Sequence, residues 1–156
     1  MSYEITKEFK FEIAHILSNY KGPCGNLHGH SYRCLISFKS EDLGAMKQDA
    51  MLIDFNDVKK LVGNLIDSLD HCFAYNKNTT DPFEQELIAL CKKYNKKTYA
   101  FETRTTAERM SEYIFKYTND MLRQMKAPIA CSKVQLFETT TGNCVYGGWN
   151  ESSWNI

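Results

Sequence analysis

The sequence predicts an α+β domain in which helices pack on one face of an antiparallel four-stranded sheet. Alternating polar and apolar residues predict a pair of strands near each end of the chain, and apolar residues at steps of three and four predict helices between these pairs. A length of 156 residues suits one domain, and no repeat, low-complexity tract or linker divides the chain. We therefore expect residues 1–156 to form a single domain.

The first strand pair flanks a loop. Residues 3–15 and 28–39 both alternate polar and apolar side chains, as half-buried strands do. Between them, residues 16–27 include the turn-forming sequence Gly-Pro-Cys-Gly-Asn. This order predicts an antiparallel pair with an elaborated connection.

Two helices are expected after this pair. Residues 54–69 carry apolar side chains at helical spacing, and Asp54 is placed to cap their first turn. Residues 82–94 predict a shorter helix, with Asp81 as its cap and Pro82 in its first turn.

The remaining elements complete the α+β pattern. A short strand at 97–102 precedes a third helix at about 106–125, whose start matches a capping box in Thr105-Thr106-Ala107-Glu108. Residues 133–140 and 144–149 predict the closing hairpin around a Thr-Gly-Asn turn.

Composition excludes several classes of partner. Lys plus Arg and Asp plus Glu number 19 each, and this zero net charge argues against a nucleic-acid or membrane surface. The sequence has no run of about 18 apolar residues, so we expect no transmembrane helix. The 6 cysteines form no C-x-x-C pair, and the first residues lack the apolar stretch of a signal peptide. We expect reduced cysteines in a cytoplasmic protein.

Three histidines have the spacing of metal ligands. His28 and His30 are two residues apart in a predicted strand, so their side chains share one face. His15 ends the preceding strand on its apolar face. Three imidazoles leave one tetrahedral position open, as in catalytic zinc sites, and the absence of a carboxylate argues against magnesium or calcium. The pattern predicts a catalytic Zn²⁺ site.

Cys24 lies four residues before His28, in a glycine-containing loop that can fold back towards the metal. A nearby cation lowers the pKa of a thiol and produces a thiolate, which could act as a catalytic base. An ordinary loop cysteine is the alternative, and the sequence leaves both open.

Asp70 and His71 follow the helix at 54–69. Histidine is suited to proton transfer near neutral pH, and an adjacent aspartate can orient it or stabilise its cation. The alternatives are a surface pair or a histidine that satisfies the end of the helix.

Glu138 ends an otherwise apolar strand face that includes Val134 and Leu136. A carboxylate in such a place needs a partner, and a ligand with two adjacent N–H donors would provide one. A salt bridge at the strand end is the alternative.

The segment Cys24-Gly-Asn-Leu-His28-Gly-His30, preceded by Phe11-Glu-Ile-Ala-His15, resembles the signature of the 6-pyruvoyltetrahydropterin synthase and 6-carboxytetrahydropterin synthase family. Further landmarks follow in family order across most of the chain: Ile53-Asp54-Phe55, Leu69-Asp70-His71, Thr105-Thr106-Ala107-Glu108 and Glu138-Thr139.

The resemblance implies a metal centre and a set of proton-transfer groups. The zinc ligands would be His15, His28 and His30. Cys24 would be the general base, and Asp70 with His71 would form the partner proton relay.

The resemblance also implies a pterin substrate. Glu138 would anchor the pterin through its exocyclic amine and ring N–H, and would complete the catalytic set. Thr105 and Thr106 would contact the pterin as well, although the proline that often precedes these residues in the family is absent here.

Family members share the tunnelling (T) fold, in which two strand pairs per subunit assemble into a trimeric barrel. The resemblance therefore implies a homo-oligomer, a trimer or a hexamer, with active sites between subunits. Such assembly would also cover the edges of an otherwise open sheet. Relative to compact bacterial members, the chain carries an inserted helical segment at about 76–104.

The three residues between Cys24 and His28 match the bacterial carboxy branch of the family, which serves queuosine (7-deazaguanine) biosynthesis. That branch converts 7,8-dihydroneopterin triphosphate to 6-carboxy-5,6,7,8-tetrahydropterin, acetaldehyde and triphosphate, and makes the expected protein a zinc-dependent carbon-carbon lyase. The pyruvoyl branch, an aldolase-like member and a non-catalytic zinc or pterin-binding protein are the alternatives.

Overall fold

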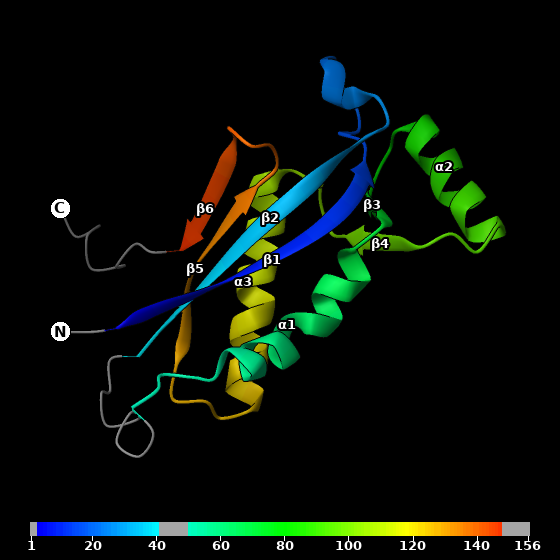
Figure 1. Ribbon diagram of the computed structural model, residues 1–156. Helices are drawn as coiled ribbons and strands as arrows, with labels where there is room; N and C mark the ends of the chain where they lie inside the picture. The colour runs from blue at the N-terminus through cyan, green and yellow to red at the C-terminus, as the bar shows by residue number, and fades with distance from the viewer. Residues whose placement is uncertain (1–2, 41–49, 148–156) are drawn as a thin grey trace, which may run out of the picture.

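The computed structural model describes residues 3–40 and 50–147, and shows six strands in one mixed sheet with the order β4-β3-β1-β2-β5-β6 (Figure 1). The elements in chain order are β1 (Glu4–His15), the 3₁₀ turn η1 (Pro23–Gly25), β2 (His28–Lys39), α1 (Phe55–Leu69), β3 (Cys72–Asn76), α2 (Pro82–Lys93), β4 (Thr98–Phe101), α3 (Ala107–Gln124), β5 (Ala130–Phe137) and β6 (Asn143–Gly147). The α+β prediction is confirmed. In the two described ranges, no helix has both the length and the apolar character needed to cross a membrane.

The two predicted strand pairs form the antiparallel part of the sheet. Strands β1 and β2 pair along their whole length, with His15 opposite His28, and β2 pairs on its other side with β5. Strand β5 ends at Phe137, earlier than the predicted residue 140, because the amide of Glu138 turns to donate to the carbonyl of Gly142. The end of the predicted strand 144–149 lies outside the described residues.

The prediction of a four-stranded, wholly antiparallel sheet is wrong. Strand β3 pairs in parallel with the end of β1, and β4 pairs in parallel with β3. The sequence analysis missed β3 because residues 72–75 are all buried, so the segment has no polar alternation. A short apolar run of this kind does not distinguish a strand from a helix.

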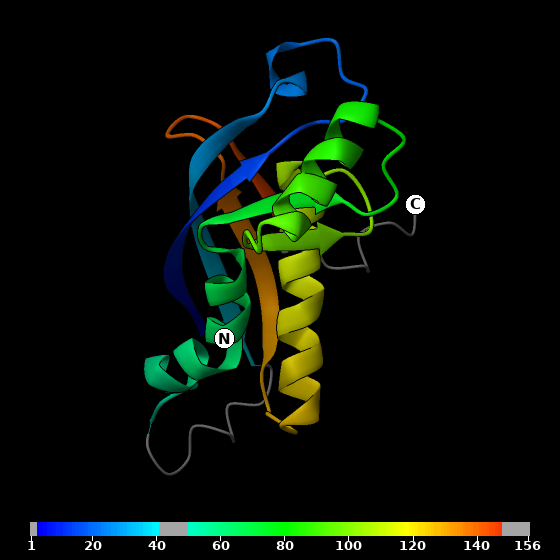
Figure 2. The ribbon, with the colours of Figure 1, turned by 90° about the vertical axis from the view of Figure 1, so that its right-hand side faces the viewer.

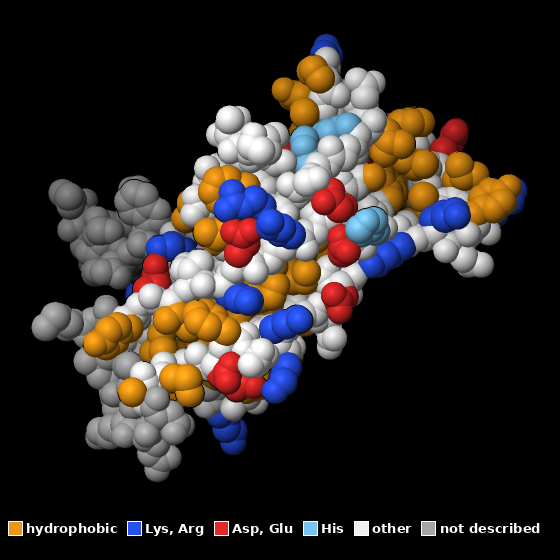
Figure 3. All heavy atoms as spheres, in the orientation of Figure 1, with side chains coloured by type: hydrophobic (Ala, Val, Ile, Leu, Met, Phe, Trp, Pro, Cys, Tyr) orange, Lys and Arg blue, Asp and Glu red, His pale blue; other side chains and the backbone are white. Residues whose placement is uncertain are grey.

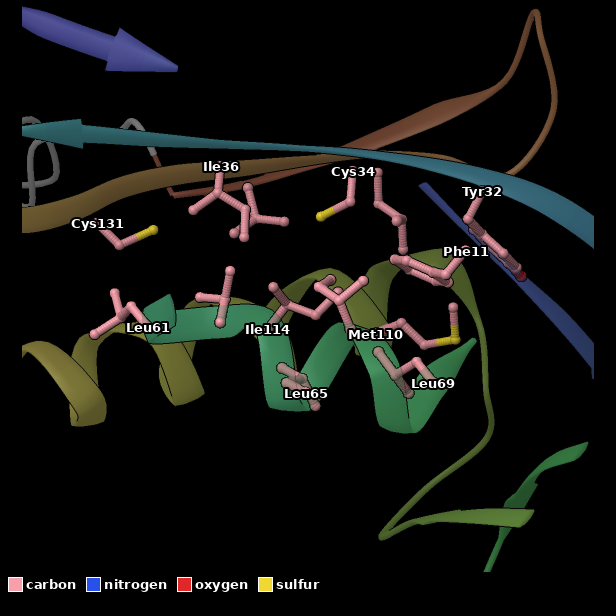
Figure 4. Packing of buried hydrophobic residues seen from close by; sticks show 14 of the residues in the cluster. Phe11, Tyr32, Cys34, Ile36, Leu61, Leu65, Leu69, Met110, Ile114 and Cys131 are labelled. Carbon is pink, nitrogen blue, oxygen red and sulfur yellow. The ribbon is translucent and has the colours of Figure 1, made fainter. Parts of the chain in front are cut away.

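The main core lies between the sheet and two helices. Figures 1 and 2 show α1 and α3 against the same face of the sheet, and Figure 4 shows Cys34 and Ile36 of β2 pointing towards Leu61, Met110 and Ile114 of these helices. These side chains are almost completely buried, and their removal from water is the main stabilising contribution.

Helix α2 contradicts the prediction that all helices share one face. Successive residues of β3 point to opposite sides, so Cys72 and Ala74 join the main core, whereas Phe73 and Tyr75 form a second cluster with Ile16. Side chains of α2 pack against this second cluster. Helix α2 therefore covers the opposite face at the β3–β4 edge of the sheet (Figure 1).

Candidate active site

The three predicted metal ligands converge at the end of the β1–β2 pair. The register places His15 directly opposite His28, and His30 lies two residues further along the same face of β2. Their candidate ligand atoms all lie within 4.8 Å of one another, and the Nε2 atoms of His15 and His28 are 3.1 Å apart. Strand pairing thus brings His15 to His28 and His30, which already share one face of β2.

Two backbone carbonyls set the ring orientation of two of these histidines. The Nδ1 of His15 lies 2.9 Å from the carbonyl oxygen of Thr105, and the Nδ1 of His28 lies 2.8 Å from that of Asn26. Because a carbonyl oxygen only accepts, each Nδ1 carries the hydrogen and each Nε2 keeps a lone pair. Metal-binding histidines are commonly oriented in this way by a second partner.

The electrostatics of the cluster suit a cation. Burial, followed by the nearby His28, lowers the pKa of His15 to about 4, so this ring is neutral near pH 7. Burial also lowers the pKa of His30, and Glu138 opposes that effect. The Nε2 of His30 is buried and has no hydrogen-bond partner among the described residues. Neutral imidazoles with free lone pairs fit a bound metal ion.

Glu138 faces the three histidines from the loop after β5. Its Oε1 lies 3.8 Å from the Nε2 atoms of both His15 and His30, and accepts a hydrogen bond from the Tyr32 hydroxyl at 3.0 Å. Burial and the Glu138 carboxylate raise the pKa of Tyr32, so the hydroxyl remains a donor. The side chain of Glu138 is 30% exposed and can therefore meet a ligand.

Tyr32 is a site residue that the sequence analysis missed. Its ring packs edge-on against His30, with centroids 5.7 Å apart, and is almost completely buried. The position of Tyr32 in the sequence could have identified it, because it follows His28 and His30 at steps of two on β2 and so shares their face.

Cys24 occupies the 3₁₀ turn η1 and is a free, partly exposed thiol. The amide of Leu17 donates to its carbonyl at 2.9 Å, which folds the loop back to the end of β1. The fold needs glycine at Gly25, where a Cβ would lie 2.1 Å from the Tyr20 carbonyl oxygen.

Asp70 and His71 lie between α1 and β3 and make no polar contact with the three histidines in the described residues. Asp70 Oδ2 is 2.9 Å from His71 Nδ1, and the side chain of His71 is 75% exposed. Among the described residues, the structure shows no hydrogen bond, ion pair or ring contact between this pair and the three histidines. Figure 3 correspondingly shows histidine side chains in two separate places on the surface.

A surface cavity of about 550 Å³ lies beside His71. Glu12, Ala14 and Ser31 line it, and their parity on β1 and β2 is opposite to that of the metal-ligand candidates. His30, one of the three metal-ligand candidates, also lines this cavity, so the cavity extends from His71 to the edge of the histidine cluster.

The two threonines before α3 have different surroundings. Thr105 is completely buried, and its hydroxyl lies 3.1 Å from His15 Nδ1 in addition to the carbonyl contact. Thr106 is the N-cap of α3, one residue later than the Thr105 that the capping box predicted, and accepts a hydrogen bond from the Arg109 amide at 3.4 Å.

A family model described as 6-pyruvoyl tetrahydropterin synthase matches residues 4–148, almost the whole chain. The chain belongs to this family. The sequence resemblance is thereby confirmed, including its coverage of most of the chain.

Several curated proteins that are similar to this chain are named 6-carboxy-5,6,7,8-tetrahydropterin synthase. A 6-carboxy-5,6,7,8-tetrahydropterin synthase from Haemophilus influenzae is 37% identical over 145 residues, which cover 92% of this chain and 98% of that protein. One from Aquifex aeolicus is 32% identical over 164 residues, covering 94% and 98% of the two chains.

Solved structures support the fold of the 6-pyruvoyl tetrahydropterin synthase family. An uncharacterized protein from Wolinella succinogenes superposes with a TM-score of 0.72 at 18% identity, covering 96% of this chain and 99% of that one. The Plasmodium falciparum 6-pyruvoyl tetrahydropterin synthase has a TM-score of 0.68 at 17% identity, covering 93% and 96%.

Proposed function

We propose that this chain is a 6-carboxy-5,6,7,8-tetrahydropterin synthase. It takes 7,8-dihydroneopterin triphosphate and water to 6-carboxytetrahydropterin, acetaldehyde and triphosphate, with cleavage of a side-chain carbon–carbon bond. The names of the full-length relatives support this activity. The structural observation that supports the proposal is the Glu138 carboxylate 3.8 Å from two histidines of the candidate metal centre, because a carboxylate suits the paired N–H donors of a pterin.

The proposed metal is zinc, bound through His15, His28 and His30. Imidazole suits zinc, and three protein ligands leave one coordination position for substrate. A zinc ion bound there supplies Lewis-acid polarisation of a substrate oxygen, which makes an adjacent C–H more acidic. The carbonyls of Thr105 and Asn26 keep two of the ligands in the required tautomer.

Glu138 is the proposed pterin anchor. A carboxylate with two acceptor oxygens matches the exocyclic amine and the adjacent ring N–H of a pterin, which are parallel donors. The hydrogen bond from Tyr32 restricts the carboxylate to one orientation. We assign Thr105 and Thr106 to the neighbouring wall of the pterin site, where Thr105 also orients His15.

Proton transfer is assigned to Cys24 and to the Asp70–His71 pair. As a thiolate, Cys24 removes the side-chain proton, and His71, oriented by Asp70, returns a proton as the ring is reduced. The ring gains the electrons that the side chain loses, so the reaction needs no nicotinamide or flavin.

The complete site is proposed to form between copies of the chain. Within one chain, no hydrogen bond or ion pair of the described residues joins the Asp70–His71 pair to the three histidines, although His71 and His30 line one cavity. In a homotrimer, or a hexamer of two trimers, the pair of one subunit would meet the histidine cluster of its neighbour. Closing the sheet into a barrel would also satisfy its edge strands.

Product analysis tests the proposal. Purified, zinc-loaded protein is incubated with 7,8-dihydroneopterin triphosphate, and the products are identified by mass together with an acetaldehyde assay. Formation of 6-carboxytetrahydropterin with equimolar acetaldehyde supports the proposal. A pyruvoyl product without acetaldehyde would assign the chain to the pyruvoyl branch, a dihydropterin aldehyde or alcohol would indicate an aldolase-like enzyme, and an unchanged substrate would indicate a binding protein.

A further inference from the structure

Lys97 reaches from the start of β4 to the carboxyl end of α1. Its Nζ donates hydrogen bonds to the carbonyl oxygens of Asp67 and Asp70, each at 2.5 Å. Helix α1 has no basic residue in its own last turn. Lys97 therefore supplies both the donors and the positive charge that the carbonyls at this helix end lack.

The backbone of Lys97 is anchored in the sheet. Its carbonyl oxygen accepts a hydrogen bond from the Phe73 amide at 3.0 Å, and the next residue, Thr98, is paired with Phe73 in the β3–β4 ladder. The ammonium group therefore extends from a fixed position, and the end of α1 is held relative to the sheet.

The Asp70–His71 pair lies at this same helix end and is itself tightly connected. His71 adopts a φ of 57°, which non-glycine residues rarely take, and its amide donates to the Glu12 carbonyl at 2.7 Å. The Glu12 amide in turn donates to Asp70 Oδ1 at 2.8 Å, and the other carboxylate oxygen faces His71 Nδ1. The orientation of the imidazole thus depends on where the end of α1 is held.

We propose that Lys97 is a positioning residue for His71, which it orients by fixing the Asp70 backbone at the end of α1. Its contribution to catalysis rests on the proposed function, whereas its effect on the imidazole does not. Lys97 belongs to the segment at about 76–104, which connects β3 to α3, so this segment would take part in positioning His71.

Replacing Lys97 removes a positive charge near His71 as well as two hydrogen bonds, so a control for the charge is needed. The charged side chains that line the cavity beside His71 are Glu12, Lys96 and Lys97, and Asp70 adjoins them. Glu12 accepts a hydrogen bond from Ser31 at 2.7 Å. Lys96 makes no side-chain hydrogen bond or ion pair within the described part of the chain, so Lys96→Met removes a neighbouring charge and no contact.

The test compares Lys97→Met with Lys97→Arg and with the matched control Lys96→Met. Ring ¹⁵N shifts, assigned to His71 with a His71→Asn variant, report which nitrogen carries the hydrogen at a pH where the ring is neutral. We expect the Nδ1–H form in the unaltered protein, in Lys97→Arg and in Lys96→Met, and a mixture of tautomers in Lys97→Met. In the same variant kcat should fall on the order of 10-fold, with KM and zinc content nearly unchanged.

Outcomes of this test separate the two proposals. If Lys97→Met keeps both the Nδ1–H form and the original kcat, or if Lys96→Met has an equal effect, the positioning role is overturned. If the tautomer is lost while kcat is unchanged, positioning stands and the assignment of His71 in the proposed function fails. A lower melting temperature with an unaltered tautomer would mean that Lys97 only stabilises the helix end. Lys97→Gln replaces Lys97→Met if the latter does not fold.

Discussion

The hydroxyl of Tyr32 donates a hydrogen bond to Glu138 Oε1 at 3.0 Å, and this same oxygen lies 3.8 Å from the Nε2 atoms of His15 and His30. A side chain at the middle of the sheet therefore controls the direction of the carboxylate that faces the candidate metal centre. One oxygen atom thus connects the candidate metal centre with the proposed pterin anchor.

Removal of this hydroxyl tests its role. In Tyr32→Phe, Glu138 loses a donor that is worth about 1.5–3 kcal/mol when the acceptor is charged. We expect the KM for the pterin substrate to rise roughly 10-fold or more, with zinc content unchanged. Steady-state kinetics and metal analysis measure both quantities. An equal loss of zinc would show that Tyr32 supports the metal centre instead.

Glu138→Gln is expected to weaken pterin binding more than metal binding. The amide retains one acceptor oxygen but presents N–H donors where the pterin also has donors. Isothermal titration with a pterin that lacks the triphosphate gives the binding change, and atomic absorption gives the zinc content. Equal loss of both would indicate a structural role for this carboxylate.

Cys24→Ala should nearly abolish turnover and leave zinc bound. General-base catalysis typically contributes on the order of 10²–10⁴ in rate, and alanine cannot accept the proton. The measurement is kcat on zinc-loaded protein, with metal stoichiometry as the control for an intact site. Near-normal activity would remove Cys24 from the role of base.

The metal centre itself is tested by His15→Ala. Loss of a ligand should lower zinc affinity by more than about 100-fold, because changes to the groups that only orient a ligand already cost about 10–100-fold. Thr105→Val is the matched variant: it retains the carbonyl acceptor 2.9 Å from His15 and should lose less than the ligand substitution. Competition with a chromogenic chelator measures both affinities. Zinc removal should inactivate the enzyme reversibly.

Asp81 provides a test of stability against pH. The backbone amide of Asn19 in the Cys24 loop, followed by those of Glu84 and Phe83, holds the pKa of Asp81 below its usual value of 3.8. A carboxyl with a lowered pKa stabilises the fold above its unfolded-state pKa, and this contribution disappears as the pH falls through the lower, folded-state value.

Two substitutions separate the charge of Asp81 from its role as helix cap. Asp81→Asn keeps a good cap, so it should change stability little at pH 7 but reduce the loss of stability in acid. Asp81→Ala also removes the cap of α2 and should lower the free energy of unfolding by about 1 kcal/mol at pH 7. Urea unfolding at pH 3 to 7 measures these effects, and an unchanged acid dependence in Asp81→Asn would exclude Asp81 as its source.

The sequence by itself determined the parts of this protein that depend on local periodicity. Alternation established strands β1 and β2 and placed His28 and His30 on one face, since side chains two apart in a strand point the same way. Helical spacing and capping residues established all three helices, with Asp54 and Asp81 as the N-caps of the first two, whereas the cap of the third lies one residue later than predicted, at Thr106. The family motifs then indicated the pterin chemistry.

Only the tertiary structure decided which distant elements become neighbours. Tyr32 and Glu138 are 106 residues apart, and His15 and Thr105 are 90 apart, so no local pattern indicates that they touch. The parallel addition of β3 and β4, the packing of α2 on the opposite face and the reach of Lys97 to α1 have the same origin. Each depends on how buried surfaces match across the sheet, a property of the assembled core that sequence periodicity does not encode.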